Sequence, residues 1–93
     1  MKISAVIPVL DEEESLRQLY DEFVAAVSAA DYSYEIIFLD DGSTDGSWDV
    51  IQELSAADEM VRGIRFRRNF GKAAALHAGF QVAQGDLVFT LDA

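Results

Sequence analysis

The amino-acid sequence predicts an α/β fold built on a parallel sheet, and three observations carry this prediction. Four apolar runs have the length of a strand. Three longer stretches carry apolar residues at helical spacing. The strand-like and helix-like stretches alternate along the whole chain, without an internal repeat or a linker. Such alternation indicates βαβ units with right-handed crossovers, in which all strands run parallel.

The first strand is predicted over residues 3–10 (ISAVIPVL), with Pro8 near its end, where one ladder donor can be spared. Asp11 is expected to cap the helix that follows, and Glu14 stands three residues on, as in a capping box. That helix is predicted over residues 11–30 because its apolar residues share one face: Leu16, Leu19, Tyr20, Phe23, Val24 and Val27.

The second strand is predicted over residues 34–39 (YEIIFL). It ends abruptly in two adjacent carboxylates, Asp40 and Asp41, where one turn residue would suffice. Either Ser43 or Thr44 is then expected to cap a second helix. The inward face of this helix is assigned to Trp48, Ile51 and Leu54.

The third strand is predicted over residues 62–66 (RGIRF), and a third helix over about residues 71–83. The fourth strand, residues 86–91 (DLVFTL), follows a break at Gly85. The third helix is expected to pack through Ala74, Leu76 and Phe80. The predicted architecture is a Rossmann-like parallel sheet with alternating helices and strand order 3-2-1-4, which places a crevice between strands 1 and 4.

Composition narrows the class of protein. The formal net charge of −10 argues against a nucleic-acid partner, which needs a dominant basic surface. The chain has no Cys, so disulfides and thiolate metal sites are excluded. No signal peptide is visible, and no apolar stretch approaches the ~18 residues of a membrane span. The 93 residues are therefore expected to form at most one domain, cytoplasmic by itself or as part of a longer protein.

The carboxyl ends of the strands deliver the residues that carry chemistry, because ligands of such sheets bind at that edge. Acids follow three strands: Glu12 after the first, Asp40 and Asp41 after the second, and Asp92 after the fourth. The third strand delivers cations instead, including Arg68 and Lys72. Five of the seven basic residues lie within the eleven positions 62–72. On so acidic a chain, this run indicates a local anion site.

A structural explanation exists for part of this pattern. The acids of residues 11–14 are accounted for by helix capping and the helix dipole alone. Asp40 can be a turn former, and Arg62 and Arg65 can be surface residues of their strand. The adjacent pair of carboxylates and the confined basic run favour function, because capping does not require either.

The combination predicts a metal-bound nucleotide diphosphate. Arg and Lys suit phosphate oxygens, and carboxylates suit a hard divalent cation that bridges phosphates. The first strand runs into PVLDEEE without a glycine, so the backbone cannot approach a diphosphate closely there. A divalent cation, Mg²⁺ or Mn²⁺, is therefore expected to neutralise the charge of the diphosphate.

Four motifs, taken in order, resemble the N-terminal half of family-2 glycosyltransferases with a GT-A fold: IPVLDEEESL, LDDGSTDGS, RNFGKAAALHAGF and GDLVFTLDA. The most similar branch is that of the polyprenyl-phosphate sugar transferases, which act on dolichyl or undecaprenyl phosphate. The resemblance implies that residues 1–93 form the nucleotide-sugar-binding half of such a domain, truncated at the family's Asp-x-Asp motif. The family usually has Asn where this chain has Asp11.

The resemblance also implies roles for individual residues. The nucleotide-binding set would be Pro8, Leu10, Glu12, Asp40, Asp41 and Ala93, with Asp41 accepting a hydrogen bond from the base and Asp40 supporting it. Asp92 would open the metal motif, and Arg68 and Lys72 would bind a phosphate. No catalytic residue is expected within the chain, because the family's base and acceptor-binding part lie further on.

The reaction implied is transfer of a sugar from a nucleotide diphosphate to a polyprenyl phosphate at the cytoplasmic face of the membrane. The 93-residue chain alone is expected to be inactive, and the open edge of its fourth strand predicts self-association or a marginally stable monomer. Two alternatives are a dinucleotide-binding oxidoreductase domain and a phospho-receiver module. The first lacks the G-x-G-x-x-G fingerprint after strand 1. The second would need an acceptor Asp after strand 3, where Arg67 and Arg68 stand.

Overall fold

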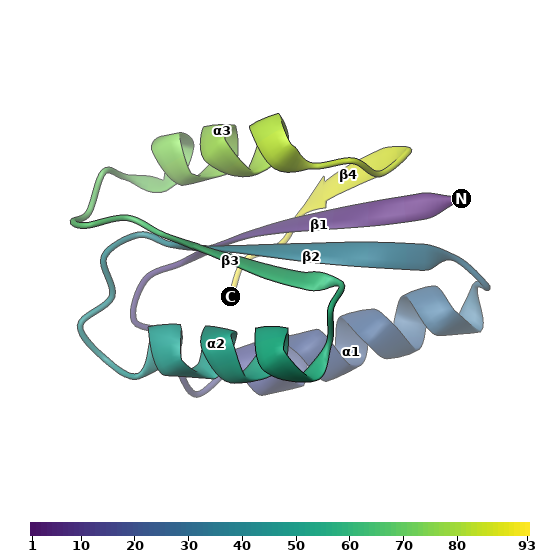
Figure 1. Ribbon diagram of the computed structural model, residues 1–93, viewed down its shortest axis with the longest axis horizontal. Coiled ribbons are helices and arrows are strands. Elements are labelled where there is room, and N and C mark those ends of the chain that lie inside the picture. The colour runs from purple at the N-terminus through teal and green to yellow at the C-terminus, as the bar shows by residue number, and fades with distance from the viewer.

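A computed structural model of the protein describes all 93 residues as seven alternating elements (Figure 1). The strands are β1 (Lys2–Val9), β2 (Ser33–Asp40), β3 (Val61–Arg65) and β4 (Leu87–Thr90). The helices are α1 (Leu16–Ala29), α2 (Ser47–Ala57) and α3 (Lys72–Val82). Every strand pairing is parallel and the order is β3-β2-β1-β4, so the predicted sheet is confirmed.

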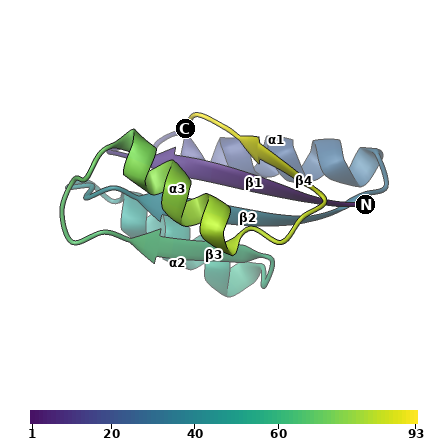
Figure 2. The same cartoon turned by 90° about the horizontal axis from the view of Figure 1, so that it is seen from above.

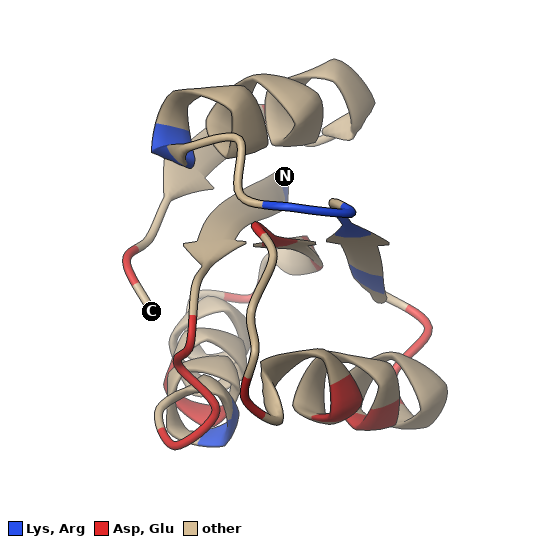
Figure 3. Ribbon diagram, turned by 90° about the vertical axis from the view of Figure 1, so that its left-hand side faces the viewer, with Lys and Arg blue, Asp and Glu red and all other residues tan.

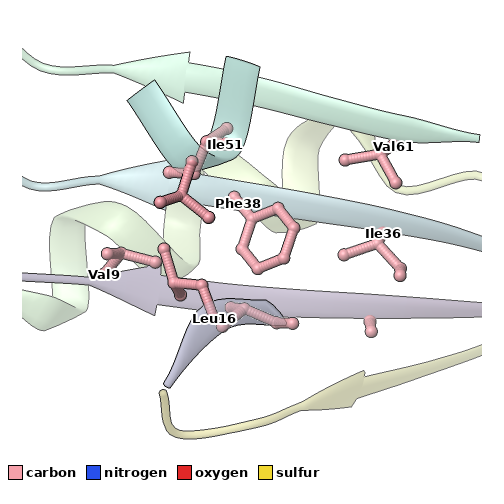
Figure 4. Packing of buried hydrophobic residues seen from close by; sticks show 9 residues of the cluster. Val9, Leu16, Ile36, Phe38, Ile51 and Val61 are labelled. Carbon is pink, nitrogen blue, oxygen red and sulfur yellow. The ribbon is translucent and has the colours of Figure 1, made fainter. Parts of the chain in front are cut away.

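The sheet lies between two helical layers. Helices α1 and α2 cover one face and α3 covers the other (Figures 1 and 2). Along β2, Ile36 and Phe38 belong to the apolar cluster on the α1 and α2 side, which Figure 4 shows. Ile37 and Leu39 belong to the smaller cluster under α3. Because both faces of the strand are buried, its sequence reads as a continuous apolar run.

The strand register determines where the site can form. Val9 is paired with Asp40, and Asp40 with Arg65, so β1, β2 and β3 end side by side. On the other side of β1, the last β4 pair is Thr90 with Val6. The residues beyond β4 therefore run beside the last residues of β1.

The prediction that Asp11 caps the first helix is wrong. Helix α1 begins at Leu16, and its N-cap is Ser15 rather than Asp11. Asp11 adopts a left-handed backbone conformation with φ of 53°, which Asp tolerates better than most residues. Its Oδ1 accepts hydrogen bonds from the amides of Thr44 at 2.8 Å and Asp45 at 3.3 Å. The carboxylate therefore holds the loop before α2 instead of capping α1.

The prediction that Ser43 or Thr44 caps the second helix is also wrong. Helix α2 begins at Ser47, beyond both Ser43 and Thr44. Asp45 Oδ1 accepts a hydrogen bond from the Ser47 amide at 2.8 Å. The Ser43 hydroxyl instead accepts from the Asp11 amide at 3.0 Å. The loops after β1 and β2 are thus joined reciprocally, which fixes both at the edge where ligands are expected.

Helix α3 packs on the sheet through its small residues. Ala75 and Gly79 are buried, and a Cβ at Gly79 would collide with the Val6 side chain. Leu76 packs beside them, as predicted, but Phe80 does not, because 49% of it is exposed. Because α3 approaches the sheet closely at Gly79, the side of the helix that carries Phe80 faces outward. None of the three helices combines the length and apolar character that crossing a membrane requires.

Candidate functional site

A pocket of about 380 Å³ lies at the carboxyl edge of the sheet, where the residues after β4 lie beside the end of β1. Its lining is Pro8, Val9, Leu10, Glu12, Asp41, Asn69, Gly71, Lys72, Asp92 and Ala93. Seven of the nine residues predicted from the sequence are among them, and only Asp40 and Arg68 are not. Figure 3 looks onto this edge, with acidic segments below and basic segments above the strand ends.

The carboxylate of Asp41 joins the end of β2 to the loop between β3 and α3. The residue is only 4% exposed. Its Oδ1 accepts a hydrogen bond from the Phe70 amide at 2.8 Å, and its Oδ2 accepts from the Gly71 amide at 3.0 Å. A carboxylate has about four acceptor positions, so two remain for a ligand in the pocket that Asp41 lines.

Asp40 lies behind the lining and is fully buried. Its Oδ1 accepts a hydrogen bond from the Ser43 amide at 2.9 Å. Its Oδ2 has no hydrogen-bond partner, and the nearest cation is the Arg65 Nε at 3.8 Å. Asp40 thus fixes the turn that follows Asp41, and it is not itself open to the pocket.

Gly42 brings two loops into backbone contact. Its φ is 83°, a conformation that side chains other than Gly rarely adopt. A Cβ at this position would lie 2.7 Å from the Asn69 nitrogen and 2.8 Å from the Arg68 carbonyl carbon. The glycine therefore permits the close approach that the hydrogen bonds from the Phe70 and Gly71 amides to Asp41 require.

The two predicted phosphate-binding cations are placed differently. Lys72 lines the pocket, and its Nζ donates to Asp92 Oδ1 at 2.7 Å. The Arg68 guanidinium instead lies 4.9 Å from the ring centre of Phe70 and outside the lining. Asn69 and Gly71 line the pocket although no role was predicted for them. Their place directly after the third strand, inside the basic run, was the available signal.

The β1 side of the pocket offers both an apolar and an acidic surface. Leu10 is 45% exposed, so its side chain is free to contact a flat ligand. The amide of Glu12 donates to the Ser47 hydroxyl at 2.9 Å, which fixes the backbone of this loop against α2. The Glu12 carboxylate is contacted weakly by the Ser15 hydroxyl at 3.4 Å.

The pocket offers a divalent cation few ligands from the protein itself. No three His, Cys, Asp or Glu side chains stand close enough together to hold a metal on their own. Asp92 offers hard oxygens at the pocket, and Mg²⁺ or Mn²⁺ commonly takes one or two carboxylates with the rest from phosphates and water. The site thus fits a cation that arrives with a diphosphate, and Asp92 is the ligand that this chain would supply.

The sequence was compared with known proteins. The profile of the family described as glycosyl transferase family 2 matches residues 4–93. The undecaprenyl-phosphate 4-deoxy-4-formamido-L-arabinose transferase of Aeromonas hydrophila is 46% identical over 98% of this chain and 28% of its own length. The enzyme of the same name from Proteus mirabilis is 45% identical over 99% of this chain and 28% of its own length. The chain thus spans little more than a quarter of these relatives.

Two solved structures share the fold. The crystal structure of S. aureus TarS 1-349 superposes with a TM-score of 0.79 at 20% identity, covering 99% of this chain and 27% of that one. The mannosyltransferase PcManGT from Pyrobaculum calidifontis, in complex with GDP-Man and Mn²⁺, superposes with a TM-score of 0.73 at 22% identity. That match covers 97% of this chain and 26% of the other.

Proposed function

The chain belongs to glycosyl transferase family 2, and from this premise we propose that it forms the nucleotide-sugar-binding part of an enzyme that glycosylates a polyprenyl phosphate. The resemblance seen in its motifs is confirmed, as is the GT-A fold. Family membership over residues 4–93 leaves no place for an oxidoreductase or phospho-receiver domain. The observation that carries the proposal is the pocket at the strand ends, where Asp41, Asp92 and Lys72 meet.

The pocket supports a division of roles between its two sides. Pro8, Leu10 and Glu12 would border the base and ribose, and Ala93 lines the same pocket. Asp41 holds the loop with one set of lone pairs and offers the others to an N–H of the base. Asp40 supports it by fixing the next turn. These roles are those that the family resemblance implies, and they are supported by the place of Pro8, Leu10, Glu12 and Asp41 in the pocket lining.

The diphosphate is proposed to lie near Lys72 and Asp92. Their contact at 2.7 Å places a cation beside a carboxylate, and a metal-bound diphosphate offers a charge partner to each. When bound with Asp92, Mg²⁺ or Mn²⁺ would stabilise the charge of the departing diphosphate. The related fold of PcManGT, in complex with GDP-Man and Mn²⁺, supports this class of donor. Arg68, stacked on Phe70 beside the pocket, would reach a phosphate by leaving that ring.

The acceptor is proposed from the relatives, whose names specify undecaprenyl phosphate. Such a lipid lies in a membrane, so the protein would work at its cytoplasmic face. An acceptor phosphate is already anionic and needs little activation by a base. The residues that bind the acceptor are proposed to lie outside these 93 residues, and the isolated chain is expected to lack transferase activity.

Replacing Asp41 with alanine is expected to weaken nucleotide binding about tenfold or more, because a charge-assisted hydrogen bond contributes roughly 1.5 to 3 kcal/mol. The affinity is measured by titrating UDP or GDP, each with Mn²⁺, into the chain and following the NMR chemical shifts of the protein, which detect weak binding. Asp45→Ala is the matched control, because the hydrogen bond from Ser47 lowers the pKa of Asp45 and marks it as an acid of the helix start. Equal losses at the two positions would contradict the assignment of Asp41.

We also propose that the isolated chain pairs with a second copy through β4. This strand forms one edge of the sheet, and its Leu87, Val88 and Phe89 are 42 to 49% exposed. An open edge with apolar side chains invites strand addition. Sedimentation velocity is expected to show dimers that Val88→Lys abolishes. Met60→Lys, which changes an exposed apolar residue away from that edge, should leave them intact, and a wild-type monomer would refute the proposal.

A further inference from the structure

Acidic and basic residues occupy different parts of this molecule. Residues 61–85 contain five of the seven basic residues and neither Asp nor Glu, although the chain has 17 acids. This acid-free segment comprises β3, the loop after it and α3. Figure 3 shows the basic segments on β3, on that loop and at the start of α3, whereas most acidic segments lie on the side of α1 and α2. Most of the cations are therefore gathered on one part of the surface of a protein of net charge −10.

The loop at the centre of this surface also exposes an aromatic ring. We define the basic loop as residues 65–72, which hold four of the cations, all of them exposed. Phe70 lies between them and is 54% exposed. Its ring packs edge-on against Phe66, with centroids 5.6 Å apart, so it is held in place rather than buried. A large apolar side chain flanked by cations is the chemistry that the headgroup region of an anionic membrane accepts.

The position of the basic loop relative to the pocket gives this surface a use. The loop that exposes Phe70 also supplies Asn69, Gly71 and Lys72 to the pocket lining. A membrane that touches Phe70 would therefore lie beside the place proposed for the nucleotide diphosphate. A lipid-linked acceptor could then reach that place without leaving the bilayer surface.

We propose that the basic loop docks this protein on an anionic lipid surface, with Phe70 at the headgroup level and Arg67 and its neighbours on lipid phosphates. The choice of a membrane over another polyanion rests on the proposed function, whose acceptor is a lipid. Most acidic segments lie on the side of α1 and α2 (Figure 3), and their repulsion of an anionic membrane is screened over about 8 Å at physiological ionic strength. Lys72 is paired with Asp92 and Arg65 lies 3.8 Å from Asp40, so Arg67 and Arg68 are the cations available to the lipid.

The experiment measures co-flotation of the chain with phosphatidylcholine vesicles and with vesicles containing added phosphatidylglycerol. Wild type is expected to bind only the anionic vesicles and to be released by salt. Arg67→Glu should weaken binding at least about fivefold, the effect of one cation at an anionic surface. Arg17→Glu is the matched control, because it makes the same charge change on α1, where Arg17 pairs with Glu53. It should alter binding less than twofold, while Phe70→Ser should weaken it.

Three outcomes would overturn the proposal: equal binding to neutral vesicles, equal losses for Arg67→Glu and Arg17→Glu, or no vesicle binding by wild type. Tighter binding to duplex DNA than to anionic vesicles would assign the surface to nucleic acid instead. The side chain of Arg67 lies outside the proposed nucleotide pocket, so UDP and GDP titrations of the same samples report on that pocket separately. A wild-type chain that binds nucleotide but no vesicles refutes the docking surface alone. A wild-type chain that binds anionic vesicles but no nucleotide refutes the proposed function alone.

Discussion

Replacing Gly42 with alanine is expected to lower the free energy of unfolding by about 2 to 6 kcal/mol, the sum of backbone strain and overpacking. The backbone φ of 83° strains any L-residue, and the added Cβ would meet the backbone of Arg68 and Asn69 within 2.8 Å. Backbone atoms cannot rotate away as a side chain can. The loop after β3 must therefore retreat, and the hydrogen bonds from Phe70 and Gly71 to Asp41 should break.

Gly71→Ala separates these two costs. Gly71 has a φ of 98°, yet nothing lies within 4 Å of its would-be Cβ. Its replacement should cost only the strain, about 1 to 3 kcal/mol. Urea denaturation measures both losses, and hydrogen exchange at the Phe70 amide reports whether its bond to Asp41 survives. Equal losses in the two variants, with the Phe70 amide still protected in Gly42→Ala, would show that the loops accommodate the added Cβ without separating.

The sheet could be predicted from the sequence because its strands are buried on both faces. A continuous apolar run such as Ile36 to Leu39, placed between helical stretches, indicates a strand that is buried on both faces. The parallel direction of the strands then follows from the βαβ alternation, and the order is the one expected of a doubly wound sheet. The position of the pocket follows in turn, since the carboxyl ends of the strands meet at one edge.

The connections between the loops could not be predicted, because their partners are distant in the sequence. Asp11 carries a local signal for a helix cap, but its carboxylate bonds Thr44, 33 residues away. Asp41 was expected to offer its carboxylate to a base, and no local pattern indicates that it also bonds two amides about 30 residues away. Phe80 was assigned inward by its helical spacing, whereas the close approach at Gly79 decides which face of α3 packs.

Glu35 is a further residue that the sequence did not single out. It is 4% exposed at the amino-terminal part of β2, away from the pocket. The Ser4 hydroxyl donates to its Oε2 at 2.5 Å, and the Gln84 amide donates at 2.6 Å. Ser4 in turn accepts a hydrogen bond from the Gly85 amide at 2.8 Å. One carboxylate thus fastens the turn between α3 and β4 to the two central strands.

Replacing Glu35 with alanine is expected to cost about 2 to 5 kcal/mol of unfolding free energy, because two charge-assisted hydrogen bonds are lost and buried donors stay unpaired. Glu35→Gln should cost less, because its carbonyl oxygen can still accept from the Gln84 amide. Urea denaturation measures both. The binding of UDP or GDP to the folded variants should be unchanged, since Glu35 does not line the pocket.

The pH dependence tests the charge of Glu35 separately. Burial raises its pKa, but the hydrogen bonds from Ser4 and Gln84 and the charges of Lys2 and Arg62 outweigh burial and lower the pKa below its ordinary value of 4.5. A carboxyl whose pKa is lower in the folded state contributes stability that is fully present above the unfolded value. That contribution is lost as the pH falls through the folded value. The stability difference between wild type and Glu35→Gln should therefore be constant above pH 4.5 and shrink below it. The other carboxyl groups titrate in both proteins and cancel in this difference, so a constant difference at all pH values would mean that the carboxylate charge contributes nothing to the fold.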